Sequence, residues 1–105
     1  MKEIVNNYKE ALLKSKKSEN TVYAYVTDVN LYVKYLNNLN VNIKEADNLS
    51  VTSYIQYLLS QGKSERSINR IVISLRSFYN YLKEESVLSE IPNIYYKNVS
   101  TTKKL

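Results

Sequence analysis

The chain has 105 residues, 44% of them hydrophobic and 24% charged, which suits one soluble domain with a modest core. It contains no cysteine and no histidine, which excludes a disulfide framework and removes the commonest general base and metal ligand. Its net charge of +5 at pH 7 favours polyanionic partners, of which nucleic acid is the commonest.

Apolar residues recur at steps of three and four along most of the chain, which predicts helices. A single glycine and a single proline argue against a sheet-rich fold with many tight turns. The first predicted helix spans about residues 2–14. A basic run at 14–17 leads to Ser18, a good N-cap for a second helix at about 19–38.

A third helix is predicted at about residues 51–61, with Ser50 as its N-cap and Gly62 as its stop. Ser64 then opens a fourth helix at about 65–85. The apolar residues expected on the buried stripes of the four helices are Ile4, Val5, Tyr8, Leu12 and Leu13; Val22, Tyr25, Val26, Val29, Tyr32, Val33 and Leu36; Tyr54, Ile55, Leu58 and Leu59; and Ile68, Ile71, Val72, Leu75, Phe78, Tyr79 and Leu82. The expected fold class is all-α.

The end of the chain is polar, and Ile91-Pro92 closes the compact part because proline disfavours helix in the residue before it. We therefore expect one helical domain at residues 1–92 and a linker at 93–105. No apolar run approaches the roughly 20 residues that span a bilayer, and the N-terminus lacks the apolar core of a signal peptide. A cytosolic protein without a cofactor is expected.

The side of the fourth helix that its core does not need carries hydrogen-bonding residues. These are Arg66, Asn69, Arg70, Ser77 and Asn80, with Ile73 among them and Arg76 on the flank. All three arginines of the chain thus lie on one helix. Arginine suits phosphate and guanine, asparagine suits adenine, and serine adapts to either bases or phosphates, so this face is typical of a DNA-contacting surface.

The corresponding side of the second helix is small and polar in its N-terminal half, which permits close approach to a groove. It carries Asn20, Ala24, Thr27, Leu31 and Lys34. The starts of the second and fourth helices, at Ser18 and Ser64, leave free backbone N–H groups where phosphates bind well, and Lys17 and Lys63 flank them. A solvated surface and simple capping serines are the alternative interpretations of the same residues.

Two segments carry a longer pattern. From Ser18 to Leu36 the chain follows S-x-x-T-V-x-x-Y-x-x-D-V-x-x-Y-x-x-Y-L, and from Gly62 to Leu82 it contains G-K-S-x-R-S-I-x-R and S-L-R-S-F-Y-x-Y-L. These segments resemble the N-terminal core-binding domain of tyrosine recombinases, the phage integrase family. The resemblance covers about residues 1–92.

The resemblance implies a SAM-like, orthogonal bundle of four to five helices that forms half of a clamp around duplex DNA. It places the second and fourth helices at the major groove. Carried over by position, it implies DNA contacts at Asn20, Thr21, Ala24 and Thr27, and at Ser64, Arg66, Asn69, Arg70 and Ser77. It also implies a C-terminal catalytic domain beyond residue 105, and a tetramer of the whole protein on DNA with the isolated domain a monomer. Because the family's catalytic residues belong to that second domain, we expect no enzymatic activity in this chain.

Two residues depart from a simple DNA face. Ile73 stands where the family commonly has a small residue, so it contacts either a thymine methyl group or protein. Asp28 matches the motif but is acidic, which favours a structural bond to a neighbouring helix start over a DNA contact. Two other functions fit the same helices: a helical protein-interaction module, and a free-standing helix-turn-helix-like regulator that dimerises on a palindromic site.

Overall fold

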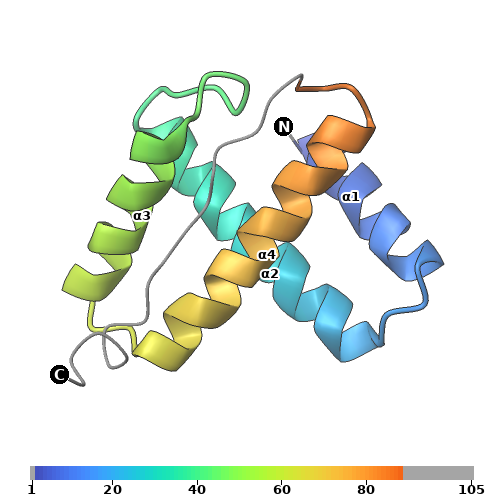
Figure 1. The fold of residues 1–105 in the computed structure, drawn as a ribbon, viewed down its shortest axis with the longest axis horizontal. Coiled ribbons are helices and arrows are strands. Elements are labelled where there is room, and N and C mark those ends of the chain that lie inside the picture. Colours follow the sequence, from blue (N-terminus) through green and yellow to red (C-terminus); the bar gives the residue numbers. More distant parts are fainter. Residues whose placement is uncertain (1, 89–105) are drawn as a thin grey trace, which may run out of the picture.

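The computed structural model describes residues 2–88, and within that range it contains four helices and no strand (Figure 1). The helices are α1 (Lys2–Lys14), α2 (Glu19–Asn38), α3 (Asn48–Ser60) and α4 (Glu65–Glu84). The predicted all-α class is confirmed. The boundary at Ile91-Pro92 and the expected linker at 93–105 lie outside the described residues.

The start of α3 differs from the sequence prediction. Its N-cap is Asp47, whose side chain accepts a hydrogen bond from the backbone N–H of Ser50 at 3.1 Å. The Ser50 hydroxyl in turn accepts from the backbone N–H of Asp47 at 3.3 Å. This reciprocal capping box satisfies two backbone donors at once, so α3 begins three residues earlier than a cap at Ser50 alone would allow.

The starts of α2 and α4 are as predicted. The Ser18 side chain accepts from the N–H of Thr21 at 3.1 Å, and the Ser64 side chain accepts from the N–H of Ser67 at 3.2 Å. Both serines have extended backbone conformations, as N-caps do. The two matched caps fix where α2 and α4 begin.

Two residues after the last residue of each helix, one residue has a left-handed backbone conformation, and only one of these four residues is a glycine. After α3 it is Gly62, as predicted, with φ of 85°. Lys16, Asn40 and Ser86 hold the same position after α1, α2 and α4, with φ between 59° and 67°. After α3 the N–H of Lys63 reaches the carbonyl of Leu58 at 3.1 Å, so the last turn's carbonyls are satisfied in a Schellman motif.

Helices α2 and α4 cross near the middle of the molecule, with α1 on one side and α3 on the other (Figure 1). α2 packs against each of the other three helices. This arrangement confirms the orthogonal bundle, with four helices in residues 2–88. No helix in the described range is long and apolar enough to cross a membrane.

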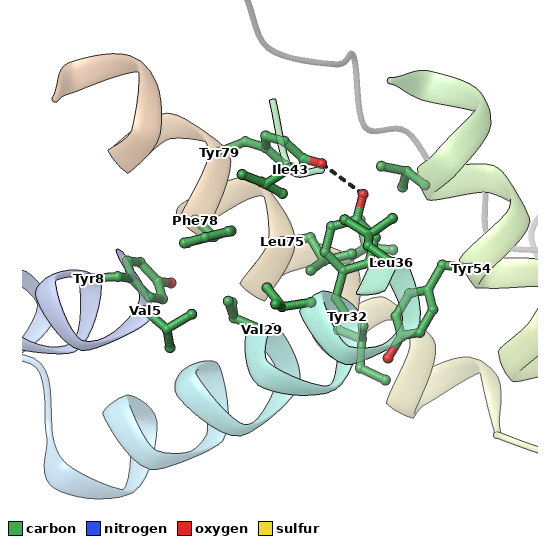
Figure 2. Packing of buried hydrophobic residues seen from close by; sticks show 14 of the residues in the cluster. Val5, Tyr8, Val29, Tyr32, Leu36, Ile43, Tyr54, Leu75, Phe78 and Tyr79 are labelled. Carbon is green, nitrogen blue, oxygen red and sulfur yellow. Dashed lines mark hydrogen bonds between the residues drawn. The ribbon is translucent and has the colours of Figure 1, made fainter. Parts of the chain in front are cut away.

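The core fills the space around the crossing of α2 and α4 (Figure 2). Four tyrosines are among its fully buried side chains: Tyr8, Tyr32, Tyr54 and Tyr79. The prediction of buried stripes is wrong for two leucines, because Leu13 is 42% exposed and Leu59 is 36% exposed. Each follows a leucine that already takes the inward position of that turn, so the second of the pair lies at the rim.

The hydroxyl groups of Tyr32 and Tyr79 lie 2.7 Å apart in the core and share one hydrogen bond (Figure 2). We expect Tyr32→Phe to lower the free energy of unfolding by about 1–3 kcal/mol, because the Tyr79 hydroxyl then has no partner. Replacing both tyrosines by phenylalanine should cost less than the two single changes added together. Urea unfolding of the three variants measures this, and strict additivity would contradict the shared bond.

Candidate nucleic-acid interface

The N-terminal halves of α2 and α4 diverge from their crossing toward one edge of the molecule, the lower edge of Figure 1. α1 and α3 occupy the outer sides, so neither covers this edge in that view. Both capped helix starts therefore lie on the same side of the domain. The DNA-contacting faces that the sequence predicts on the second and fourth helices therefore belong to α2 and α4, which cross near the middle of the molecule.

A network of three side chains joins α2 to α4. Asp28 is only 2% exposed, and it accepts from Arg70 through Nη2 at 2.8 Å and Nε at 3.2 Å. The buried hydroxyl of Ser74 donates to the same carboxylate at 2.7 Å. Arg70 itself stays 53% exposed. A fork-to-fork pair of this kind holds the guanidinium in one orientation.

The predicted structural role of Asp28 is confirmed, but its partner is not a helix start. The carboxylate bonds to two side chains in the middle of α4. Ser74 is the residue that the sequence prediction missed. Its only sequence signal is its position four residues after Arg70, on the flank of an otherwise apolar stripe.

The predicted α4 residues differ in exposure. Arg66 and Arg76 are exposed, Asn69 is partly buried, and Ile73 is 49% exposed. No helix of the described domain covers Ile73, which therefore lies on the outside of α4. The partly buried Ser77 accepts a hydrogen bond from the Tyr8 hydroxyl at 2.8 Å, so it also joins α4 to α1.

The predicted α2 residues divide between two sides of the helix. Thr21 and Ala24 lie two turns and one turn before Asp28, on the flank that meets α4. Thr27 instead lines a groove of about 500 Å³ between α1 and α2, together with Leu13 and Tyr23. Lys17, Ser18 and Asn20 are exposed at the start of the helix, and Lys63 and Ser64 are exposed at the start of α4.

By helical spacing, Arg66 and Ile73 lie one turn before and after Arg70 on α4. Helical spacing thus places Ala24, Arg66 and Ile73 one turn from a member of the ion pair of Asp28 and Arg70, and Thr21 one turn further along α2. Within the described residues, no group of histidine, cysteine and carboxylate side chains is arranged to hold a metal ion.

The family model of the phage integrase N-terminal SAM-like domain matches residues 5–86, which is most of the chain. The chain belongs to this family. Among the relatives of this integrase domain is a tyrosine recombinase of Pseudothermotoga lettingae, 34% identical over 88% of the chain and 33% of the relative. The tyrosine recombinase XerD of Halalkalibacterium halodurans is 31% identical over 98% of the chain and 37% of the relative.

The integrase domain thus spans about a third of the length of these relatives. It corresponds to the N-terminal SAM-like region of the family and not to its catalytic domain. No solved structure matches the chain significantly.

Proposed function

We propose that this chain is the DNA-binding domain of a site-specific tyrosine recombinase. The N-terminal halves of α2 and α4 clamp duplex DNA at the recombination site, and a separate C-terminal catalytic domain performs strand exchange. The whole protein assembles as a tetramer on DNA, and the isolated domain is a monomer. Family membership supports this proposal, because the relatives are tyrosine recombinases.

The observation that carries the proposal is the pair of helix starts at one edge, with Arg70 fixed between the two helices. Two of the five guanidinium donors of Arg70 bond to Asp28. Three remain for a phosphate or a base edge, and the side chain is already held in place. A donor that is held before binding loses little conformational entropy when DNA arrives.

Charge supports the same surface. Lys17 and Lys63 flank the two capped starts, where backbone N–H groups and the helix dipoles favour phosphate, while Glu19 and Glu65 in the first turns offset part of that attraction. Arg66 is exposed one turn from Arg70. The protein's net charge of +5 adds long-range attraction to DNA that weakens as salt rises.

Arg66 offers a direct test, because it is exposed and makes no contact that the core needs. We expect Arg66→Ala to weaken duplex DNA binding at low salt by about 10-fold and to reduce the salt dependence by about one phosphate contact. Lys83→Ala is the matched control, since it removes one exposed positive charge at the far end of α4. Fluorescence anisotropy with a labelled duplex measures both variants, and equal effects would contradict the assignment.

Ile73 favours one second candidate function, a surface that docks another protein. An isoleucine that is half exposed in the middle of α4 suits an apolar contact. That function predicts no binding to duplex DNA at any salt concentration. Family membership gives no support to the third candidate, the free-standing helix-turn-helix-like regulator.

A further inference from the structure

A groove of about 390 Å³ runs between the C-terminal half of α2 and α3, away from the ion pair of Asp28 and Arg70. We refer to it as the tyrosine groove. Its lining residues are Leu31, Lys34, Tyr35 and Asn38 from α2, Tyr54, Tyr57, Leu58 and Gln61 from α3 and its C-cap, and Lys63. The volume falls within the range of pockets that bind small molecules.

Three tyrosine rings form the wall of this groove. The ring centroids of Tyr35 and Tyr54 are 4.9 Å apart, and those of Tyr35 and Tyr57 are 5.3 Å apart. Tyr54 and Tyr57 are nearly parallel, with an angle of 22° between their planes. A hydrogen bond between the hydroxyls of Tyr35 and Ser53 also joins α2 to α3.

Tyr57 is the outermost ring of the cluster. It is 46% exposed, whereas Tyr54 behind it is 2% exposed. A partly exposed aromatic ring that is held from behind by other rings is a ready platform for a further planar group. Stacking on such a ring does not require the protein to order a flexible side chain.

The charge of the groove is one-sided. Lys34 and Lys63 line it, and none of its lining residues is acidic. Both lysines are exposed. A ligand that matches this lining has a flat ring for Tyr57 and a negative group for the lysines, which is the chemistry of a nucleotide.

We propose that the tyrosine groove binds an unpaired nucleotide of a DNA strand, with its base stacked on Tyr57 and its phosphate beside Lys34 and Lys63. A base inside a duplex cannot stack there, because both of its faces are covered by its neighbours. Lys63 directly precedes the N-cap of α4, so the groove begins next to the surface proposed for duplex binding. The site does not require duplex DNA to bind on α2 and α4.

The test compares a labelled six-nucleotide thymidine strand with an abasic strand that has the same number of phosphates. We expect the full chain to bind the thymidine strand more tightly, because only that strand can stack. Tyr57→Leu should weaken its binding by about 5- to 150-fold, which corresponds to the loss of one base stacked on an aromatic ring. Tyr57→Phe keeps the ring and should bind as the unaltered chain does.

Tyr23→Leu is the matched control, since Tyr23 is a 75% exposed tyrosine that lies outside the groove. It should leave thymidine-strand binding unchanged. Duplex binding should be unaffected by Tyr57→Leu, so failure of this site and failure of the duplex clamp give different results. If circular dichroism shows that Tyr57→Leu does not fold, Lys34→Gln with Lys44→Gln as its control tests the same groove, and only Lys34→Gln should weaken binding.

Three results would overturn the proposal. The first is equal affinity for the thymidine and abasic strands, which would leave only charge attraction. The second is thymidine-strand binding that both Tyr57→Leu and Lys34→Gln leave unchanged. The third is a hexaglutamate peptide that binds as tightly as the thymidine strand and is equally sensitive to Tyr57→Leu, since the groove would then favour acidic peptides.

Discussion

The helical signal of this domain is expected to be lost steeply above pH 10. Burial raises the pKa of Tyr8, Tyr54 and Tyr79 to about 12, and burial also raises the pKa of Tyr32. In the unfolded chain these hydroxyls ionise near pH 10. Between pH 10 and pH 12 the unfolded state therefore holds fewer protons than the folded state, and stability falls as pH rises.

The free energy of unfolding falls steeply with pH because several buried tyrosines ionise over the same pH range. Each contributes about 1.4 kcal/mol per pH unit between its unfolded and folded pKa. A domain with a free energy of unfolding of about 5–15 kcal/mol should unfold within about two pH units. In one titration, circular dichroism should change together with the part of the tyrosinate absorbance that comes from the four buried hydroxyls.

Tyr54→Phe tests the origin of this slope, since Tyr54 is 2% exposed and its ring can be kept. The variant should lose stability less steeply with pH, by about 1.4 kcal/mol per pH unit. Helical structure that survives while all tyrosines ionise would contradict the burial of these hydroxyls.

Replacing Arg70 is expected to lower the free energy of unfolding more than replacing Asp28, although either change breaks the ion pair between them. Arg70→Leu leaves a buried carboxylate without its cation, and we expect it to lower the free energy of unfolding by about 3 kcal/mol. Asp28→Asn leaves a half-exposed guanidinium that water can reach, and its amide oxygen still accepts from Ser74. It should cost about 1 kcal/mol.

The double variant makes the test sharper. Asp28→Asn with Arg70→Leu removes the stranded charge, so we expect it to be more stable than Arg70→Leu alone. Arg66→Leu is the control, because Arg66 is exposed on the same helix and should change stability by less than about 0.5 kcal/mol. Urea unfolding measures all four. A double variant less stable than Arg70→Leu would show that the network does not bury a charge on Asp28.

Much of the fold follows from local sequence signals. Ser18 and Ser64 are predicted as caps because a serine before a regular apolar pattern can accept from a free backbone N–H of the first turn. The same rule places the start of α3 wrongly at Ser50, because the capping box with Asp47 is the stronger local signal. The left-handed stop at Gly62 was predicted, while those at Lys16 and Ser86 were not. Lysine and serine have no special preference for that conformation, so their sequence gives no signal. Backbone hydrogen bonds accompany these turns: the N–H of Lys16 reaches the carbonyl of Leu13 at 3.3 Å, and the N–H of Val87, next to Ser86, reaches the carbonyl of Leu82 at 2.9 Å.

The sequence predicts which helices carry the candidate site, but it does not predict which side chains of different helices contact one another. A helical wheel places Arg70 on the free side of α4, which agrees with its exposure of 53%. It treats each helix alone, so it cannot show that Asp28 and Ser74 meet Arg70 across the crossing. For the same reason the contact between Tyr8 and Ser77 was missed, because it depends on how α1 packs on α4.

Chemical-shift mapping of the isotope-labelled chain with duplex DNA at low salt tests the central claim most directly. The DNA clamp predicts that the largest amide shifts fall on residues 17–24 and 63–73, with the Asp28 and Arg70 signals among those that move. Shifts should be small on the outer face of α1. Shifts confined to other surfaces, or none at all at low salt, would contradict the claim that α2 and α4 bind DNA.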